Sequence, residues 1–547
     1  MSPVIADGRE VQYIEKNTLF DYADSLNLRV PTSCGRTGEC HECIVEIRKG
    51  MNSLNLITEQ EKFLRGNYRL ACRTILEDPH ATVEFATLRR QPRILSKSIQ
   101  RKIQLDPKVT KDKSNVLRDG KIIDKYRGGI YGIAGDIGTT TVVLNLVDLE
   151  SGETIQTSSF ENPQRFGGGD VMNRISYDGG NFHGELRQVI LSSINFEIGA
   201  MTRNPDRRSV HRRCIYDVVL VGNTTMRDLL FGIDVQPIGQ KPYKSLIQTE
   251  FENKTRESTA MECSASDIGL RVHPNAKVYS GPLVGSHVGA DVAADMLAIG
   301  MDTATSPRML VDIGTNTEVV IGDSSGMVTA SCPAGPAFEG GEVTYGMPGY
   351  DGAVEAVSIL EGKVNISTIG GAEVQGICGS GLVDLLSELR RTEAMDVLGK
   401  YQDDSNQFTF APDREMYLSR SDISALAQAK SANYSGQFIA MRHFGKSIED
   451  LETLYLAGGF ANYINAHNAK SIGFIADFPT EKISKVGNAS LEGATIMLKS
   501  VASRLSIENL VKKVEHIELE TTPDFFDIFV EGCMFKPMPR EIFKAAS

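Results

Sequence analysis

The sequence predicts an α/β protein with a smaller α+β domain at its N-terminus. Three observations lead to this prediction. The chain has 547 residues, its first 72 residues contain four closely spaced cysteines, and one strand–turn–strand motif occurs twice. A chain of this length is too long for one hydrophobic core, so roughly two to four domains are expected.

The composition and charge exclude some classes of partner. Hydrophobic residues make up 41% of the chain and charged residues 23%, and the formal net charge is −12. Such an acidic chain is not expected to bind nucleic acid. The main basic run, 207–213, is interpreted as a solvated loop or helix end, with a docking patch for an acidic partner as the alternative. No secretory or membrane-spanning pattern is found, so we expect a cytoplasmic protein without a membrane partner.

The cysteine cluster predicts a metal site. Cys34, Cys40 and Cys43 form the pattern C-x5-C-x2-C, and Cys72 follows well downstream. Three thiolates from one loop and a fourth from a separate turn are typical of plant-type and adrenodoxin-type [2Fe–2S] sites. The alternative is a structural zinc site with the same four thiolates, or with His41 in place of one of them.

The sequence around the cysteines predicts a small β-grasp domain. We expect strands at 11–14, 43–48 and 83–85, a capped helix at 18–26, and a turn at 68–74 that carries the fourth ligand. The segment from Cys34 to Thr74 resembles the plant-type [2Fe–2S] ferredoxin family. The predicted ferredoxin domain is 1–92, and the polar, basic stretch 93–128 is predicted to be a linker.

The repeated motif has a specific physical use. Asp136-Ile-Gly-Thr and Asp312-Ile-Gly-Thr each follow an apolar run and continue into a second strand. A carboxylate at the end of the first strand can hold Mg²⁺ through water, and the glycine lets phosphate oxygens approach backbone amides and hydroxyls. Two such turns facing each other would grip a polyphosphate. The alternative is a plain surface turn, which is less compatible with two copies in matched contexts.

The two copies resemble the phosphate motifs of the acetate/sugar kinase, heat-shock-70 and actin superfamily, a duplicated ribonuclease H-like fold. The resemblance implies lobes at 129–305 and 306–547 that bind ATP and Mg²⁺. Asp136 and Asp312 would anchor Mg²⁺ and order the attacking water. Glu339 and Glu318 are candidates for activating that water, with a solvated or structural role as the alternative. The implied nucleotide contacts are the phosphate-loop residues Gly138, Thr139, Thr140, Gly314, Thr315 and Asn316, and the glycine pair Gly458 and Gly459 beside the adenosine.

Five further stretches look like signatures of reductive activators of corrinoid proteins: 168–175, 221–226, 338–341, 377–384 and 459–464. That resemblance implies an ATP-hydrolysing electron-transfer protein. It would pass one electron from the [2Fe–2S] cluster to Co(II) of a corrinoid protein in a methyltransferase system and so regenerate Co(I). An upstream low-potential electron donor and a homodimer are also implied.

Two other functions are compatible with the sequence. One is a ferredoxin-linked small-molecule kinase, which would need a positioned carboxylate base. The other is an ATP-driven remodelling protein that passes no electrons. The four clustered cysteines weigh against the second. Cys378 follows an apolar position and is interpreted as packed core, and the single tail cysteine, Cys533, predicts no second cluster.

Overall fold

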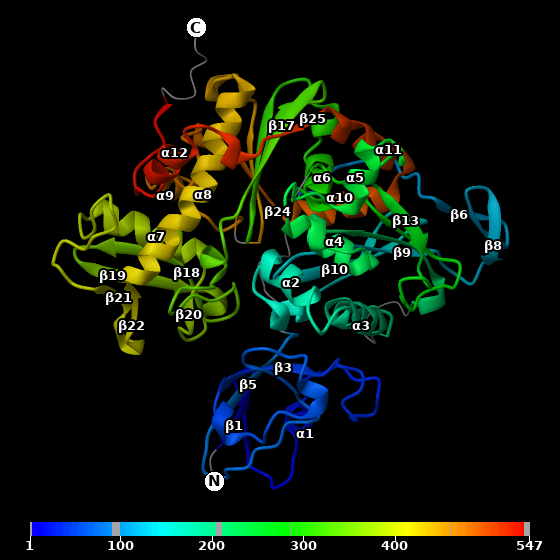
Figure 1. Cartoon of the computed structure of the whole chain (residues 1–547), viewed down its shortest axis with the longest axis horizontal. Coiled ribbons are helices and arrows are strands. Elements are labelled where there is room, and N and C mark those ends of the chain that lie inside the picture. Colours follow the sequence, from blue (N-terminus) through cyan, green and yellow to red (C-terminus); the bar gives the residue numbers. More distant parts are fainter. Residues whose placement is uncertain (1–2, 90–98, 204–209, 286, 460, 541–547) are drawn as a thin grey trace. The chain divides into compact units, whose positions relative to one another are not determined.

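The structure is a computed structural model that describes residues 3–89, 99–203, 210–285, 287–459 and 461–540. Its contacts divide the chain into two compact units (Figure 1). Unit 1 comprises 1–91, 107–257 and 261–280, and unit 2 comprises 92–106, 258–260 and 281–547. Each unit is described by itself. Part of the basic run 207–213 lies outside the described residues.

Unit 1 begins with a five-stranded sheet of order β2-β1-β5-β3-β4. Its strands are β1 (Pro3–Ala6), β2 (Arg9–Gln12), β3 (Ile44–Lys49), β4 (Tyr68–Leu70) and β5 (Val83–Thr87), and its helix is α1 (Leu19–Ser25). Thr18 and Asp21 form a capping box that fixes the start of α1, as predicted. The predicted strand 11–14 lies two residues too late. The sequence analysis missed β1, a short strand that pairs in parallel with the distant β5.

The segment predicted as a linker contains a three-stranded antiparallel sheet. Its strands are β6 (Val109–Asp112), β7 (Asn115–Arg118) and β8 (Lys121–Lys125). Buried Arg118 pairs with Asp217 at 2.9 Å and with Glu262 at 3.2 Å. Turns and ion pairs, rather than a strong apolar pattern, therefore hold this sheet on the middle lobe, which is why its composition resembles a linker.

The second sheet of unit 1 carries the first copy of the repeated motif and has the order β11-β10-β9-β12-β14-β13. Strands β9, β10 and β11 form an antiparallel meander, and β12 runs parallel to β9. The elements are β9 (Tyr131–Ile137), β10 (Thr141–Asp148), β11 (Thr154–Glu161), β12 (Ile215–Val221), β13 (Met261–Ser264), β14 (Lys277–Ser280), α2 (Val171–Asp178), α3 (Glu185–Met201), α4 (Thr224–Phe231) and α5 (Leu246–Glu252).

Unit 2 repeats this topology around the second copy. Its main sheet has the order β24-β23-β15-β16-β17-β25, in which β15, β16 and β17 form a meander and β23 runs parallel to β15. These strands are β15 (Arg308–Ile313), β16 (Thr317–Asp323), β17 (Gly326–Cys332), β23 (Leu454–Ala457), β24 (Ile483–Gly487) and β25 (Val514–His516). Five strands share one order, β11-β10-β9-β12-β14 in unit 1 and β17-β16-β15-β23-β24 in unit 2, and the sixth strand lies at opposite edges of the two sheets. The shared order confirms that the sequence repeat is a structural duplication.

The remaining elements of unit 2 surround this sheet. They are α6 (Ala290–Ala298), α7 (Gly379–Arg391), α8 (Arg420–Phe444), α9 (Ala466–Ser471), α10 (Ala489–Lys499), α11 (Val501–Leu510), α12 (Phe525–Gly532), β18 (Ala353–Leu360), β19 (Lys363–Thr368), β20 (Gly376–Ile377), β21 (Gln407–Ala411) and β22 (Met416–Ser419). Helices α6 and α10 pack so closely that a Cβ on Gly493 would lie 2.0 Å from the carbonyl oxygen of Ala294. Cys378 precedes α7 and is buried, as predicted.

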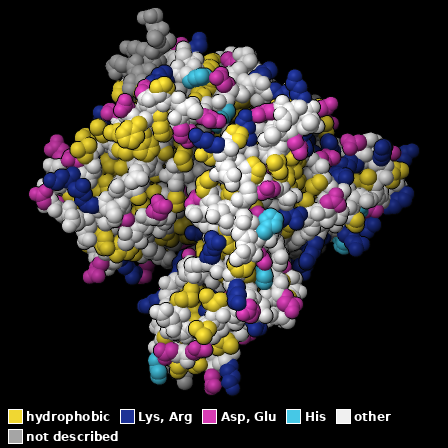
Figure 2. All heavy atoms as spheres, in the orientation of Figure 1, with side chains coloured by type: hydrophobic (Ala, Val, Ile, Leu, Met, Phe, Trp, Pro, Cys, Tyr) yellow, Lys and Arg dark blue, Asp and Glu magenta, His cyan; other side chains and the backbone are white. Residues whose placement is uncertain are grey.

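On the face that Figure 2 shows, the described residues form an apolar patch among polar side chains. In Figure 2 apolar side chains collect over α12, where Phe526 is 74% exposed and Val530 is 46% exposed. Lysine, arginine, aspartate and glutamate side chains intersperse over the face that is shown. Among the described residues, no helix combines the length and the apolar character needed to cross a membrane.

Candidate functional sites

The cysteine loop has an unusual backbone. Gly35, Arg36, Gly38 and His41 all have positive φ angles, between 54° and 87°. This left-handed geometry curls the chain between Cys34 and β3 and is accessible to glycine with little strain. At Gly38 a side chain would also collide, because a Cβ there would lie 2.8 Å from Cδ of Arg73. The two glycines are therefore required by the shape of the loop.

The structure brings the four predicted cysteines together as two pairs. The Cys43 thiol donates to the Cys72 sulfur at 3.3 Å, and Cys34 is hydrogen-bonded to Cys40. Among the described residues, no three histidine, cysteine or acidic side chains are grouped closely enough to hold a single metal ion. In a [2Fe–2S] cluster two ligands serve each iron, so paired thiols fit such a cluster.

The electrostatics of the pairs also suit iron binding. Burial would raise the pKa of Cys34, but hydrogen bonds from Thr37, Cys40 and the Gly38 backbone lower it to about 5. The hydrogen bond between Cys43 and Cys72 raises the pKa of Cys43 and lowers that of Cys72. Thiolates are the form that binds metal, so Cys34 and Cys72 release their protons to water readily, whereas Cys43 keeps its proton until iron displaces it.

His41, the alternative zinc ligand, has other contacts. Its Nδ1 lies 2.8 Å from Oε2 of Glu185, and its ring stacks on Phe63 with the centroids 4.1 Å apart. Glu185 is the first residue of α3 in the middle lobe. The backbone carbonyl of Cys40 also accepts a hydrogen bond from Gln188 of the same helix at 3.4 Å. The cysteine loop is therefore bound to the middle lobe of unit 1.

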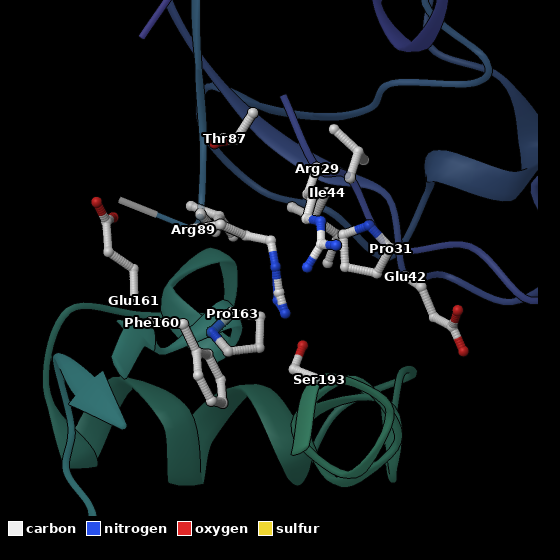
Figure 3. A pocket seen from close by; sticks show the side chains of 12 residues that line it. Arg29, Pro31, Glu42, Ile44, Thr87, Arg89, Phe160, Glu161, Pro163 and Ser193 are labelled. Atoms are coloured by element: carbon white, nitrogen blue, oxygen red, sulfur yellow. The ribbon is translucent and has the colours of Figure 1, made fainter. Parts of the chain in front are cut away.

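A second contact joins the end of β5 to the same lobe. Figure 3 shows the Arg89 side chain reaching toward Pro163 and Ser193 in a small pocket. Arg89 pairs with Glu197 on α3 and lies over the ring of Phe196, 4.1 Å from its centroid. The pocket holds about 10 Å³, little more than one water. It therefore serves as packing between the ferredoxin-like sheet and the middle lobe.

The first phosphate loop connects β9 to β10. Asp136 is near the end of β9, and Gly138 has no room for a side chain because a Cβ would lie 2.6 Å from the carbonyl of Thr141. The Thr139 hydroxyl accepts a hydrogen bond from Nδ2 of Asn223 at 3.0 Å. The Thr139 carbonyl accepts one from buried Arg174 on α2 at 2.7 Å. Amide and guanidinium donors therefore fix this loop, and Thr140 follows on its partly exposed side.

The second phosphate loop, between β15 and β16, has acidic neighbours. Asp312 lies directly opposite Glu318 in the register of the two strands. The Thr315 hydroxyl donates to Oε2 of Glu339, and the Gly314 amide donates to the Asn316 carbonyl at 3.1 Å. Thr315 and Glu339 are therefore in contact and Asp312 and Glu318 are neighbours in unit 2, and their assignment to a nucleotide stays a prediction.

Helix α6 contributes an acid that sequence reasoning missed. Asp295 is fully buried, and its Oδ1 accepts a hydrogen bond from Ser490 at 2.9 Å. Burial, and then the charge and hydrogen bond of Asp312, raise the pKa of Asp295 well above its ordinary value. Burial, together with Asp291 and Asp312, raises the pKa of Glu318 in the same way. Burial also raises the pKa of Asp312, but hydrogen bonds from Asp295 and the Ile313 backbone oppose that rise, so a protonated Asp295 can donate to Asp312 and the negative charge of the pair lies on Asp312.

The glycine pair at 458 and 459 has a structural role at the end of β23 in addition to its predicted role beside a nucleotide. Gly458 has a φ of +105°, and a Cβ there would lie 2.1 Å from the carbonyl oxygen of Ile313. The end of β23 thus presses against the end of β15, which carries the second motif. Gly459 follows directly after it, at the edge of the described segment. The contact with Ile313 requires glycine at 458 whether or not a nucleotide is present.

The fold and these sites define a class of protein: an iron–sulfur redox protein in which a ferredoxin-type domain precedes a duplicated actin-type fold. Three family models match the chain. They are a 2Fe-2S iron-sulfur cluster binding domain at 4–77, the RACo middle region at 131–304, and the C-terminal, ASKHA domain of RACo at 306–547. The chain belongs to the family of reductive activators of corrinoid proteins.

Individual relatives agree with this family. The corrinoid activation enzyme RamQ of Eubacterium limosum is 28% identical over 597 aligned positions, which cover 96% of this chain and 97% of that protein. The [Co(II) methylated amine-specific corrinoid protein] reductase of Methanosarcina barkeri is 24% identical and covers 73% of this chain and 76% of its own length. A solved reductive activator for a corrinoid, iron-sulfur protein superposes with a TM-score of 0.71 at 27% identity, over 99% of this chain and 100% of that one.

Proposed function

We propose that this protein uses ATP to pass one electron from a [2Fe–2S] cluster to Co(II) of a corrinoid protein, which regenerates the Co(I) form that accepts methyl groups. The observation that carries the proposal is the arrangement of four cysteines as two thiol pairs, in a chain that also holds both phosphate motifs. The near full-length similarity to a corrinoid activation enzyme supports the corrinoid partner. A kinase or remodelling function has no comparable support.

The need for ATP follows from the redox energetics. A plant-type cluster supplies an electron at roughly −400 mV. Each 59 mV of uphill one-electron transfer costs roughly 1.4 kcal/mol, so a gap of a few hundred millivolts requires several kcal/mol. Nucleotide binding and hydrolysis would meet this requirement by favouring one conformation of the complex with the partner over another.

We assign the nucleotide chemistry to the two motifs. Asp136 and Asp312 would hold Mg²⁺ through water, because carboxylates are its preferred protein ligands. Thr139, Thr140 and Asn316 would donate to phosphate oxygens from their side chains, Thr315 would do so from its backbone amide, and the amides beside Gly138 and Gly314 would do the same. Glu339, fixed by the Thr315 hydroxyl, would accept a proton from the attacking water. Gly458 and Gly459 would border the adenosine.

Cys34, Cys40, Cys43 and Cys72 would hold the cluster, with one pair on each iron. We also propose a low-potential protein as the upstream electron donor, a homodimer, and a cytoplasmic location, where thiols stay reduced. For the domain division we propose 1–92, 93–128, 129–305 and 306–547, with the second segment as an ordered connector rather than a free linker.

The proposal is tested with the cluster-loaded protein under anaerobic conditions. It is mixed with a corrinoid protein in the Co(II) state, a low-potential reductant, and either Mg-ATP or no nucleotide. We expect the Co(I) absorption to develop only with Mg-ATP, and to be lost in Cys40→Ala and Asp312→Ala. Cys263→Ala, which alters a cysteine on β13, is the matched control and should retain activity. ATP turnover without cobalt reduction, across several corrinoid partners, would favour a kinase or remodelling protein instead.

A further inference from the structure

Helix α2 contacts both candidate sites of unit 1. On one side, Arg174 donates to the carbonyl oxygen of Thr139 in the first phosphate loop at 2.7 Å. On the other, the Tyr177 hydroxyl donates to the carbonyl oxygen of Phe63 in the ferredoxin-type domain at 2.6 Å. The two side chains are three residues apart, so less than one helical turn separates the contacts. One short helix therefore links the phosphate loop to the domain that carries the cysteines.

The hydrogen bond between Arg174 and the Thr139 carbonyl would be costly to break. Arg174 is fully buried, and its other hydrogen bonds go to the Gly168 carbonyl at 3.1 Å, the Gln164 side chain at 3.4 Å and the Met226 sulfur on α4 at 3.0 Å. Burial and the nearby Arg165 lower the pKa of Arg174 to about 9, so it stays charged at neutral pH. A buried guanidinium that loses an acceptor carries a large desolvation penalty. If nucleotide binding shifts Thr139, α2 is therefore expected to move with it.

The contact at the ferredoxin-type domain is equally well fixed. Tyr177 is fully buried, and its ring packs edge-on against Phe166 with the centroids 5.4 Å apart. Phe166 in turn packs against Phe63 at 5.3 Å, and Phe63 stacks on His41, the residue after Cys40. Any other packing of these rings would leave a void, and any other position of the buried hydroxyl would break its hydrogen bond. A movement of α2 is therefore expected to move the residues around Phe63 and His41 as well.

We propose that α2 couples the first phosphate loop to the cysteine loop, with Arg174 and Tyr177 as positioning residues, so that nucleotide affinity depends on the oxidation state of the cluster. The inference rests on the proposed function, because it requires a cluster on the four cysteines and a nucleotide at Thr139. Binding linkage is reciprocal. If the nucleotide alters the surroundings of the cluster, adding one electron to the cluster must alter nucleotide affinity by the same factor.

The experiment is anaerobic calorimetry of the cluster-loaded protein with Mg²⁺ and a non-hydrolysable ATP analogue. It compares the oxidised protein with protein reduced by dithionite, which is itself oxidised as it supplies the electron. We expect the two dissociation constants to differ by about fivefold or more, the lower end of typical allosteric coupling. In Tyr177→Phe, which keeps the ring and removes only the hydroxyl, the ratio should fall below about twofold.

Tyr216→Phe is the matched control. Tyr216 is also fully buried in unit 1 and donates one hydrogen bond, to Asp124 at 2.9 Å, but it lies on β12 rather than α2. Its ratio should equal that of the wild type. Should Tyr177→Phe fail to load a cluster, Arg174→Lys keeps the positive charge on α2 but removes the guanidinium that donates to the Thr139 carbonyl, and it should also reduce the ratio.

The outcomes separate the inference from the proposed function. Equal affinities in both oxidation states, or an unchanged ratio in Tyr177→Phe (in Arg174→Lys, if Tyr177→Phe loads no cluster), would overturn the role of α2 and leave the proposed function standing. A protein that loads no cluster or binds no analogue in either state would overturn the proposed function, and the inference with it.

Discussion

The two phosphate loops share a sequence motif and a backbone topology, yet their neighbours differ in chemistry. The first loop is fixed by donors: Asn223 binds the Thr139 hydroxyl, and Arg174 binds the Thr139 carbonyl. The second loop is surrounded by carboxyl groups, since Asp312 lies opposite Glu318 and is hydrogen-bonded to Asp295. Duplication has preserved the strand–turn–strand geometry while the surrounding side chains diverged.

We expect this difference to give the two loops unequal tasks. Carboxylates are the ligands that Mg²⁺ prefers, so Asp312 in the second loop is expected to contribute more than Asp136 to holding the cation and the attacking water. The first loop is tied through α2 to the domain that carries the cysteines. It is therefore suited to sense the nucleotide and to transmit its presence. The variants below test whether the two loops do differ in this way.

The largest effect is expected at Asp312. Asp312→Asn removes the charge that Asp295 leaves on this carboxylate, and the rate of ATP hydrolysis should fall by about 10²–10³-fold. Asp136→Asn, the same change in the first loop, should lower it by only about tenfold. Steady-state phosphate release measures both rates. Equal losses in the two variants would contradict a division of labour between the loops.

A second test concerns Glu339. Glu339→Gln keeps an oxygen that can accept the Thr315 hydroxyl but removes the proton acceptor, so kcat should fall about 100-fold with little change in ATP affinity. Full activity in Glu339→Gln, combined with loss in Glu339→Ala, would show instead that Glu339 only holds Thr315. Phosphate release and equilibrium nucleotide binding together distinguish the two roles.

A smaller effect is expected in the first loop. Asn223→Ala removes the donor to Thr139 and also the N-cap of α4, where the Asn223 side chain accepts from the Met226 amide at 2.9 Å. Losing one such hydrogen bond should weaken ATP binding by about fivefold, while kcat at saturating ATP changes by less than about twofold. Calorimetric titration gives the affinity. A fall in kcat without a change in affinity would mean that this loop acts in the chemical step.

The last prediction concerns stability rather than activity, in unit 2 away from the second loop. Burial lowers the pKa of Lys430, whose ammonium donates to the Met534 carbonyl at 2.8 Å, to about 7. Because the unfolded chain binds the proton more tightly, stability should rise between about pH 7 and 10, by at most about 1.4 kcal/mol per pH unit. Lys430→Met should remove that rise, as followed by urea unfolding at each pH. An unchanged pH dependence in the variant would assign the slope to other groups.

Local features of the fold could be predicted because each has its own sequence signal. The capped helix after Thr18 and both D-I-G-T turns were found where expected. Strand β1 and the sheet of β6, β7 and β8 were missed, because short or polar strands depend on pairing with distant partners. Periodicity within a window cannot reveal such pairings.

In the candidate sites, too, residues with a local sequence signal were predicted, and residues that depend on tertiary contacts were missed. The cysteines were found by spacing, and the structure places them as two pairs. Asp295 was missed because α6 is distant in sequence from the second motif and reaches Asp312 only through tertiary packing. Arg174 was noticed as part of a signature, but its contact with Thr139 cannot be inferred without coordinates. Gly458 was predicted because a side chain there would block the nucleotide. The structure adds that a side chain there would also collide with the backbone of Ile313.

The central claim is that ATP use and electron transfer are one coupled event. The most direct test is a single-turnover experiment in which pre-reduced, cluster-loaded protein is mixed with a Co(II) corrinoid protein and Mg-ATP in a stopped-flow spectrometer. We predict that cluster oxidation and Co(I) formation occur at the same rate and in equal amounts, and that neither occurs without Mg-ATP. Co(I) formation without cluster oxidation, or ATP hydrolysis accompanied by neither change, would contradict the account.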